Sequence, residues 1–445
     1  MTHLSVLEWG SVPIGNGGFT RAQADRLLAA ARAHPSGGYE GTSILVDHHR
    51  WLRSRQVVGV LAAEDCSLEI LPKIDEFRAE AGVKKYIGGP ATLRHRLVHM
   101  LDVALGLEIG IGNEAKMARQ GETLLDILIR LFADKLVTEV RQGLPQNYYI
   151  QFEEDLPNLR GRLDVARQFT ALAVRPDRLA CRFDALSVDT FLLQVMKACV
   201  LFLARYARRS ETQRRLAELR LVLAEVQNVP RALLPWYKVR FDRSNRHWGS
   251  LLALAKLLLR RQWQATHHDA NRSGPKGTTL LFPMNDLFES YVAVLLKRAV
   301  EPLGFEVTAQ GGLRYCLEEL DSDDLPRRAL FRTRPDIIVR SGRQAVLILD
   351  TKWKHVVSDV VDAKRGVSES DVYQLMAYAQ IYNCPRLLLL YPHHRELVGD
   401  SGVIARHRVR IDGCDERLTI ASIELCAPKG EIVNALRDVV VSQLH

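Results

Sequence analysis

The sequence contains no pair of cysteines separated by two residues, and its seven cysteines are an odd number. A disulfide framework requires paired cysteines, and it forms in oxidising compartments. The histidine doublets at 48–49, 267–268 and 393–394 also have no zinc-ligand partners near them, so we expect them at the surface or in loops. The cysteine pattern therefore predicts free thiols and argues against a small secreted domain held by disulfides.

Long apolar runs are absent as well. The most hydrophobic stretches, 195–207 and 251–259, are short and are interrupted by Lys197, Arg205 and Lys256. A membrane-spanning helix needs about 20 mostly apolar residues, so neither stretch is expected to cross a bilayer. The start of the chain lacks a basic region followed by an apolar run, which argues against a signal peptide. We therefore expect the protein in a bacterial or archaeal cytoplasm.

Phosphate-binding and calcium-binding loops are missing too. The segment 15–18 is glycine-rich, but no Gly-Lys-Ser/Thr follows it, so it predicts a tight turn rather than a nucleotide site. The acidic segment 321–324 lacks the rest of an EF-hand pattern, and we expect a solvated loop there. No Walker A motif is present elsewhere in the chain.

The composition itself is that of an ordinary soluble globular protein. Hydrophobic residues make up 47% of the chain and charged residues 25%. A chain of 445 residues is long enough for two or three domains with sizeable cores. The net charge of +9 permits binding to a polyanion such as nucleic acid, but it does not require it.

The pattern of apolar residues divides the chain into three regions, which predict a multidomain α+β protein. Residues 1–85 form a β-rich N-terminal module, 86–275 are mainly helical, and 280–445 alternate between helix and strand. The polar stretch 267–279 predicts a linker. The expected strands are 4–9, 44–46, 57–61, 68–71, 387–391 and 418–423, and the expected helices are 20–34, 93–105, 124–142, 189–208, 213–226, 247–263, 284–300 and 431–444.

One stretch of the C-terminal region carries the most specific chemistry. Residues 334–339 and 346–352 each predict a short strand, with a turn at 341–343 between them. Side chains alternate between the two faces of a strand, so Asp350 and Lys352 share a face. If the loop has three residues, Asp336 pairs with Ile348 and points the same way as Asp350. A loop one residue longer or shorter would reverse this relation.

Two carboxylates at one end of a hairpin can hold a hard divalent cation, most naturally Mg²⁺. Such a metal activates water and neutralises charge on a phosphodiester. Lys352 can orient or deprotonate that water, or it can stabilise the oxyanion as a fixed cation. The alternative is two ordinary strands with solvated charged ends. The combination of Pro335-Asp336, a hydrophobic second strand and Asp350-Thr351-Lys352 favours a nuclease.

These residues resemble known families. Pro335-Asp336 followed by Asp350-Thr351-Lys352 resembles the PD-(D/E)xK nuclease motif, and Gln374 with Tyr378 resembles the Gln-x-x-x-Tyr element of its RecB-like branch. The wider sequence resembles the McrC subunit of McrBC-type (5-methylcytosine-dependent) restriction systems. The segments that carry this second resemblance are 57–61, 68–74, 159–164, 181–184, 334–337, 350–354 and 371–379.

The resemblance implies a C-terminal restriction-endonuclease-like α/β core that binds Mg²⁺, with Mn²⁺ as a possible substitute. The implied metal ligands are Asp336, Asp350 and the backbone carbonyl of Thr351. Glu289, on the helix that precedes the sheet, is a further candidate, and its alternative is a solvated helix residue. The lack of closely paired cysteines argues against the iron–sulfur cluster that some RecB-like nucleases carry.

Gln374 and Tyr378 lie four residues apart, so they share a helix face. The resemblance implies that this pair orients the site or contacts the DNA backbone, and the alternative is ordinary helix packing. The basic residues of the middle region predict either a stripe that contacts phosphates or solvated, ion-paired side chains. These basic residues are Arg160, Arg162, Arg175, Arg178 and Arg182.

The function implied by the resemblance is that of an endonuclease subunit in defence against phage or other foreign DNA. The subunit would cleave double-stranded DNA with Mg²⁺ and stimulate a separate McrB-like AAA+ GTPase, a hexameric ring. We expect the strands 57–61 and 68–74 of the N-terminal module to contact that ring. Two alternatives are a self-sufficient RecB-like repair nuclease and a non-catalytic adaptor of an AAA+ motor. The intact Asp336, Asp350 and Lys352 argue against the adaptor.

Overall fold

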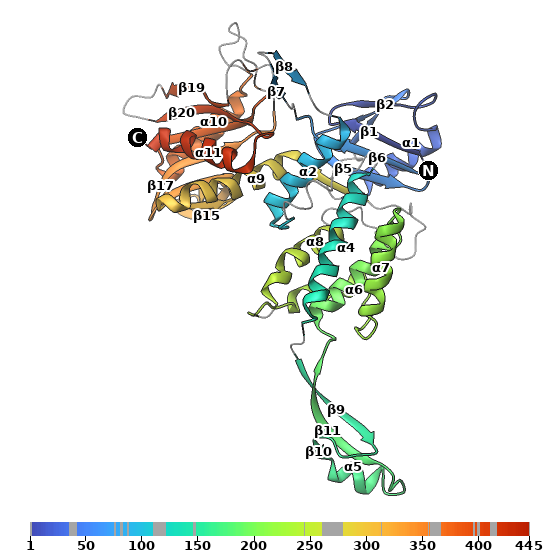
Figure 1. The fold of residues 1–445 in the computed structure, drawn as a ribbon. Helices are drawn as coiled ribbons and strands as arrows, with labels where there is room; N and C mark the ends of the chain where they lie inside the picture. The colour runs from blue at the N-terminus through green and yellow to red at the C-terminus, as the bar shows by residue number, and fades with distance from the viewer. Residues whose placement is uncertain are drawn as a thin grey trace. The chain divides into compact units, whose positions relative to one another are not determined.

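The structure is a computed structural model of the whole chain, shown in Figure 1. The description below concerns residues 2–34, 42–74, 77–80, 83–86, 89–109, 122–145, 148–243, 245–259, 279–312, 314–354, 356, 366–394, 397, 401–409 and 416–444. The predicted linker 267–279, the histidines 267–268 and Cys414 fall wholly or largely outside these ranges.

The chain folds into two compact units. The first, here called the main unit, contains Met1–Leu124 together with Gln262–His445. The second, the inserted unit, is Leu125–Arg261. Helix α2 (Pro90–Leu105), which the sequence placed in the helical middle, belongs to the main unit and packs against α9 (Met284–Val300).

The N-terminal part of the main unit is built on a four-stranded sheet with the order β1-β6-β5-β12. Strand β1 is parallel to β6, and β5 is antiparallel to both β6 and β12. Helix α1 (Arg21–Arg32) packs on β5 and β6, and Thr20 caps it through a reciprocal pair of hydrogen bonds with Gln23. The strands are β1 (Thr2–Leu7), β2 (Ser11–Pro13), β3 (Leu45–Asp47), β4 (Trp51–Ser54), β5 (Val57–Ala63), β6 (Cys66–Leu71), β7 (Phe77–Glu80) and β8 (Val83–Tyr86), of which β2, β4 and β3 form a second sheet.

Strand β12 (Thr279–Pro283), which follows the inserted unit in the sequence, completes this sheet. Its Leu281 lies in the same apolar core as Leu27 of α1 and Leu61 of β5. Helix α9 begins at Met284, directly after Pro283. The N-terminal sheet is therefore joined directly to the C-terminal region, because its strand β12 leads straight into the helix that precedes the C-terminal sheet.

Six of the described strands of the C-terminal region form a mixed sheet with the order β13-β16-β17-β18-β20-β19. β16 and β17 form an antiparallel hairpin, whereas β17 is parallel to β18, and β18 is parallel to β20. Helix α10 packs on β17 and β18, while α9 and α11 pack together and also contact β17. The elements are β13 (Glu306–Ala309), β16 (Ile337–Ser341), β17 (Gln344–Thr351), α10 (Glu369–Tyr382), β18 (Arg386–Pro392), β19 (Gly402–Arg408), β20 (Arg417–Ile423), α11 (Lys429–Leu444) and the 3₁₀ turn η7 (Glu301–Leu303).

A separate two-stranded hairpin lies between β13 and β16 in sequence. It consists of β14 (Tyr315–Leu320) and β15 (Pro326–Arg332), and nearly all of its residues are exposed. The acidic segment 321–324 forms its turn and is exposed, as the sequence predicted. Histidines 48 and 49 are exposed as expected. His394 lies in the loop after β18, but it is 3% exposed and its ring bonds to the carbonyl of Val356.

The inserted unit consists of a helical part and a small β arm. The arm is a three-stranded sheet with the order β10-β11-β9 and the short helix α5 (Figure 1). Arg182 in β11 pairs with Glu153 and Asp164, which agrees with the ion-paired alternative for that arginine. The elements are α4 (Leu124–Gln142), β9 (Tyr148–Leu156), β10 (Arg162–Leu163), α5 (Val165–Thr170), β11 (Leu179–Ser187), α6 (Phe191–Leu203), α7 (Ser210–Val222), η3 (Arg231–Leu233), η4 (Trp236–Lys238), η5 (Arg246–Trp248) and α8 (Gly249–Leu259).

Two predictions from composition are supported over the ranges given above. Every cysteine that the structure describes is a free thiol. Across the same ranges, no helix combines the length and the apolar character that a bilayer crossing requires.

We expect Gly59→Ala to destabilise the main unit by about 3 kcal/mol. Gly59 has a φ of +129°, which alanine adopts only with strain, and an added Cβ would overlap the carbonyl oxygen of Leu280 in β12. Gly342→Ala is the matched control, because Gly342 also has a positive φ but an added Cβ meets no atom there. Urea unfolding should show a loss of only about 1 kcal/mol for the control. Equal losses for the two variants would mean that the β5–β12 contact does not limit stability.

Candidate active site

The predicted hairpin is present, but its register differs from the expected one. Ile338 lies opposite Ile348, the turn is the two-residue Gly342-Arg343, and a bulge follows Val339. The predicted pairing of Asp336 with Ile348 was therefore wrong by two residues, and continuation of the observed pairing brings Asp336 beside Asp350. Because side chains alternate with a period of two, a shift of two residues leaves both aspartates on one face.

The structure brings Asp336, Asp350 and Lys352 together. Asp336 Oδ2 accepts hydrogen bonds from the backbone N of Thr351 at 2.8 Å and from its Oγ1 at 3.0 Å. Lys352 Nζ lies 2.8 Å from Asp350 Oδ2. Asp350 is 1% exposed, and its Oδ1 has no hydrogen-bond partner among the described residues. The site therefore contains a buried carboxylate oxygen whose bonding capacity is unused.

Burial governs the electrostatics of this cluster. Burial and then the charge of Asp336 raise the pKa of Asp350 to about 6. Burial likewise raises the pKa of Asp336, although the two hydrogen bonds from Thr351 oppose this effect. Burial alone would lower the pKa of Lys352, but the carboxylates of Asp350, Asp371 and Asp336 raise it above its ordinary value. Lys352 is thus a cation near neutral pH, and its charge offsets only part of the effect of burial on the pKa of the two aspartates.

Glu289 belongs to the same cluster. It lies on α9, and burial followed by the charge of Asp336 raises its pKa to about 7. Its side chain hydrogen-bonds to Gln310, whose backbone N donates to the carbonyl oxygen of Asp336 at 2.7 Å. The helix before the sheet therefore directs a carboxyl group toward Asp336, as the family resemblance implied.

Gln374 and Tyr378 contact one another on α10, where Gln374 Nε2 donates to Tyr378 Oη at 2.8 Å. The helix covers the same face of the sheet that carries Asp350, since Ile348 and Tyr378 share one core. Within the described part of the chain, neither residue hydrogen-bonds to Asp336, Asp350 or Lys352. Their expected role in the site thus remains a prediction.

Asp371 is a site residue that the sequence interpretation missed. It is 6% exposed, and its Oδ1 lies 3.5 Å from Lys352 Nζ while its Oδ2 lies 3.2 Å from Lys354 Nζ. In the sequence interpretation it was only the first residue of the segment 371–379, and it was assigned no role in the site. A signal was available, because Asp371 precedes Gln374 by three residues and so shares its helix face.

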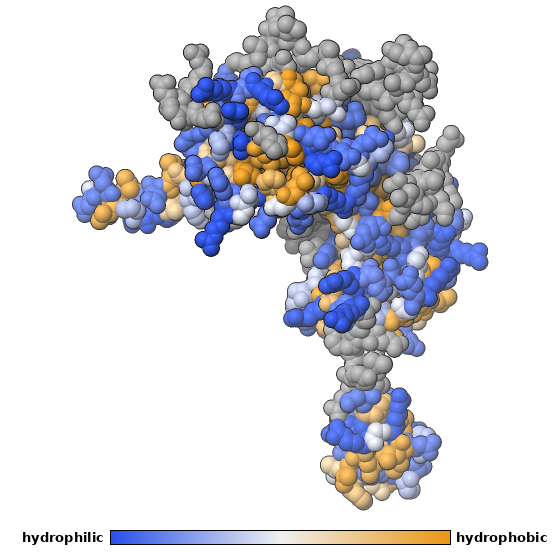
Figure 2. Space-filling model, turned by 60° about the vertical axis from the view of Figure 1, so that its left-hand side comes forward, coloured by the Kyte–Doolittle hydropathy of each residue, from blue (hydrophilic) through white to orange (hydrophobic). Residues whose placement is uncertain are grey.

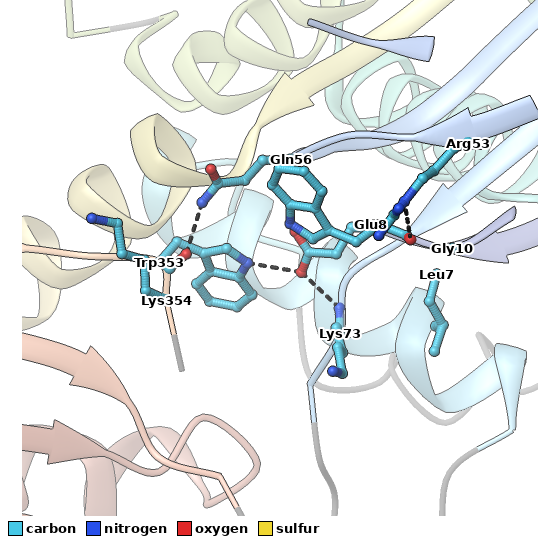
Figure 3. A pocket seen from close by; sticks show the side chains of 9 residues that line it. Leu7, Glu8, Gly10, Arg53, Gln56, Lys73, Trp353 and Lys354 are labelled. Atoms are coloured by element: carbon cyan, nitrogen blue, oxygen red, sulfur yellow. Dashed lines mark hydrogen bonds between the residues drawn. The ribbon is translucent and has the colours of Figure 1, made fainter. Parts of the chain in front are cut away.

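The N-terminal module fixes the segment that follows Lys352 (Figure 3). Trp353 Nε1 donates to Glu8 Oε1 at 2.8 Å, and Gln56 Nε2 donates to the carbonyl oxygen of Trp353 at 2.7 Å. Glu8 Oε1 also accepts from the backbone N of Lys73 at 2.8 Å. Trp353 further packs edge-on against Phe288 of α9. The chain directly after the Asp-x-Lys sequence is therefore held from two sides.

The donor set fits Mg²⁺. No group of three or more histidine, cysteine, aspartate or glutamate side chains is arranged as a metal site in the ranges that the structure describes. Mg²⁺ does not need such a cage, because it commonly binds through one or two carboxylates and keeps several waters. The oxygen of Asp350 that has no partner among the described residues, and the raised pKa of both aspartates, fit a site in which a divalent cation would be a further partner.

Comparisons with known proteins agree on one family. The model of the family described as "McrBC 5-methylcytosine restriction system component" matches residues 52–392. The chain is 22% identical to the "Type IV methyl-directed restriction enzyme EcoKMcrBC" of Escherichia coli (strain K12) over 334 residues, which covers 72% of this chain and 89% of the relative.

Two solved structures from Thermococcus gammatolerans have a similar fold. The first is a half-complex from a tetradecameric assembly of McrB AAA+ hexamers with bound McrC, at a TM-score of 0.72 and 19% identity over 99% of this chain and 100% of that chain. The second is the McrBC complex, at a TM-score of 0.53 and 21% identity over 67% of this chain and 88% of that chain. At these identities the likeness shows the fold.

We expect Glu8→Gln to change how stability depends on pH. Burial raises the pKa of Glu8 from an ordinary value near 4.5 to about 7. Between these values the folded state holds a proton that the unfolded state has released, so this group makes stability fall as the pH rises. A pKa difference of this size changes the free energy of unfolding by about 3 kcal/mol across that pH range.

Glutamine can accept the same two hydrogen bonds but does not titrate. Urea unfolding of the wild type and the variant should therefore diverge from about pH 4.5 to about pH 7, with the variant losing less stability as the pH rises. Parallel pH profiles for the two proteins would contradict this assignment.

Proposed function

Because the chain belongs to the family of McrBC 5-methylcytosine restriction system components, we propose that it is the endonuclease subunit of a modification-dependent restriction complex. In this proposal it cleaves phosphodiester bonds of double-stranded DNA with Mg²⁺. It also stimulates the GTPase of a McrB-like AAA+ ring, and it cuts when bound to that ring. The main unit provides the cutting site, and the inserted unit provides a surface for the partner.

The observation that carries the nuclease proposal is the meeting of Asp336, Asp350 and Lys352 on one face of a mixed sheet. Helix α10 packs on the sheet, and so does the pair of helices α9 and α11. This arrangement supports a restriction-endonuclease-like α/β core of the PD-(D/E)xK type. A structural ion pair alone does not explain why a second carboxylate is buried beside the first at the cost of raised pKa values.

We assign the metal to Asp336, Asp350 and the backbone carbonyl of Thr351, with Glu289 as a further ligand and with Mn²⁺ as an acceptable substitute. When bound, the metal activates water and neutralises charge on the phosphodiester. Lys352, which is held as a cation by its neighbours, stabilises negative charge on the phosphate rather than removing a proton. Gln374 and Tyr378 orient the site or contact the DNA backbone.

The partner surface differs from the one that the sequence suggested. Strands β5 and β6, expected to contact the ring, are almost entirely buried, and each is paired with a strand on both edges. Strands in this position have no free edge or face to offer to another protein.

The β arm of the inserted unit is the better candidate for the partner surface. Helix α5 has no buried residue, and Phe169 and Val174 of the arm are 76% and 88% exposed. Figure 2 shows apolar residues gathered on the surface of this arm, at the bottom of the view. Exposed apolar clusters of this kind mark protein interaction sites. One of the similar solved structures is from an assembly of McrB AAA+ hexamers with bound McrC, which supports a ring of this type as the partner.

The two alternative functions, a self-sufficient nuclease and a non-catalytic adaptor, predict different properties. A self-sufficient RecB-like repair nuclease would cut DNA without any AAA+ protein, and family membership disfavours it. A non-catalytic adaptor would not need to bury two carboxylates and a lysine in one cluster.

We expect Asp350→Asn to lower Mg²⁺-dependent cleavage of plasmid DNA by the assembled complex at least about 100-fold. Loss of a residue that only supports a metal ligand commonly costs 10- to 100-fold, and Asp350 is assigned as a ligand itself. The exposed Asp438 on α11 provides the control, and Asp438→Asn should cut like the wild type. Both variants should stimulate the partner's GTPase fully. Undiminished cutting by Asp350→Asn would move the active site elsewhere.

We expect Phe169→Ala to weaken binding to the AAA+ partner at least fivefold, since buried aromatic anchors commonly contribute about 1 kcal/mol or more to an interface. Phe331→Ala is the matched control, because Phe331 is 69% exposed on the β14–β15 hairpin. The measurements are the affinity for the purified ring and the stimulated GTP hydrolysis rate. A larger loss for the control than for Phe169→Ala would assign the partner contact to the main unit.

Deletion of residues 1–85 is not a clean test of partner binding. The deletion would remove β5 and β6 from the core that contains Leu281 of β12. The strand that leads into α9 would lose its sheet, so the truncated protein would fail for structural reasons.

A further inference from the structure

A cavity of about 820 Å³ lies in the main unit, between the N-terminal module and the chain that follows Lys352 (Figure 3). It is distinct from the aspartate cluster, since none of Asp336, Asp350 and Lys352 lines it. Its walls combine aromatic and cationic side chains. The lining residues used below are Glu8, Trp9, Arg53, Lys73, Trp353 and Lys354.

Trp9 presents an indole that is 43% exposed. The backbone of Trp9 has a φ of +62°, and its carbonyl oxygen accepts a hydrogen bond from Arg53 Nε at 3.3 Å. The guanidinium of Arg55 lies 5.4 Å from the centre of the ring. An exposed tryptophan in a left-handed conformation is uncommon, because non-glycine residues adopt it at a cost. The fold thus tolerates a strained backbone conformation at the residue that presents this indole.

The charge of the walls favours an anion. Arg53, Lys73 and Lys354 line the cavity, and among the described residues that line it the one carboxylate belongs to Glu8. Glu8 is 3% exposed, its Oε1 is engaged by Trp353 and Lys73, and burial raises its pKa to about 7. Near neutral pH this carboxyl is therefore partly protonated, and it opposes the three cations less than a fully ionised carboxylate would.

The cavity is connected to the active site through one chain segment and one ion-pair network. Trp353 follows Lys352 directly, and Lys354 Nζ lies 3.2 Å from Asp371 Oδ2. The other oxygen of Asp371 lies 3.5 Å from Lys352 Nζ. Successive residues of an extended chain are at most about 3.6 Å apart, so a ligand in the cavity sits within a few residue lengths of the assigned metal ligands.

We propose that this cavity binds one unpaired nucleotide of the DNA strand beside the bond to be cut, with its base stacked on Trp9 and its phosphate facing Arg53 and Lys73. Aromatic faces combined with a basic groove are the common means of binding single-stranded nucleic acid. A base can stack on an indole only after it leaves its own base stack, so the nucleotide must be extruded or single-stranded. This inference rests on the proposed DNA cleavage and adds a second contact with the same strand.

The test measures binding separately from cutting. Fluorescence anisotropy of a short fluorescein-labelled single-stranded oligonucleotide, with EDTA present and the full-length protein, gives the affinity. Trp9→Ala should weaken binding about 5- to 100-fold, the range found for loss of one stacking aromatic. Trp9→Phe should restore most of the affinity, because phenylalanine still offers a ring to the base. The same oligonucleotide with abasic sites should bind the wild type more weakly.

Trp51→Ala is the matched control, since Trp51 is 46% exposed on β4 but does not line the cavity. It should bind like the wild type. Lys73→Gln is a second probe that leaves Trp9 intact. It should lower the slope of log Kd against log salt by about 0.7, the value for one lost phosphate contact on a single strand.

Unchanged binding by Trp9→Ala and Lys73→Gln would overturn the proposal, and so would an equal loss from Trp51→Ala. Loss of affinity for the AAA+ partner instead of the oligonucleotide would make the cavity a peptide-docking site and would overturn it as well. Asp350→Asn separates the two proposals. If that variant still cuts DNA while Trp9→Ala binds the oligonucleotide weakly, the assigned active site is wrong and the nucleotide site stands.

Discussion

The pairing of β5 with β12 is the constraint on which the main unit depends. It closes the N-terminal sheet with a strand that leads without a break into α9, and α9 carries Glu289 toward Asp336. The module also holds Trp353 through Glu8 and Gln56. The N-terminal module is therefore part of the support for the catalytic segment, although it contributes none of the residues assigned to the metal.

The aspartate cluster illustrates a compromise between stability and chemistry. Asp350 is buried, and its Oδ1 has no hydrogen-bond partner in the part of the chain that the structure describes. An unsatisfied buried acceptor commonly costs about 1–3 kcal/mol. The surrounding sheet can tolerate this cost because the strands β16, β17 and β18 are almost wholly apolar at their centres. Thr351 bonds to Asp336, and Lys352 pairs with both Asp350 and Asp371. These contacts fix the positions of the two aspartates but do not cancel all of their negative charge.

The sequence predicted which catalytic side chains share a face of one strand, but it did not predict contacts between distant segments. The period of two along β17 placed Asp350 and Lys352 on one face, and an error of two residues in the register left that relation intact. The role of Asp371 was hidden because its spacing also fits a helix start. Strand β12 was missed because a five-residue apolar segment has no sequence signal for a partner as distant as β5. Strand β9 of the arm was not predicted either.

Strand β12 is synthesised long after β5, the strand it pairs with, and this order affects folding during biosynthesis. Gln56 and Trp353, which meet across the junction, are 297 residues apart in the chain. During synthesis from the N-terminus, β5 and β6 emerge long before β12, so one edge of a very apolar sheet stays unpaired until the ribosome has passed residue 283. Open apolar edges invite pairing with other chains. The protein thus has a long interval of exposure to aggregation before its first sheet is complete, and it should depend on chaperones during that interval.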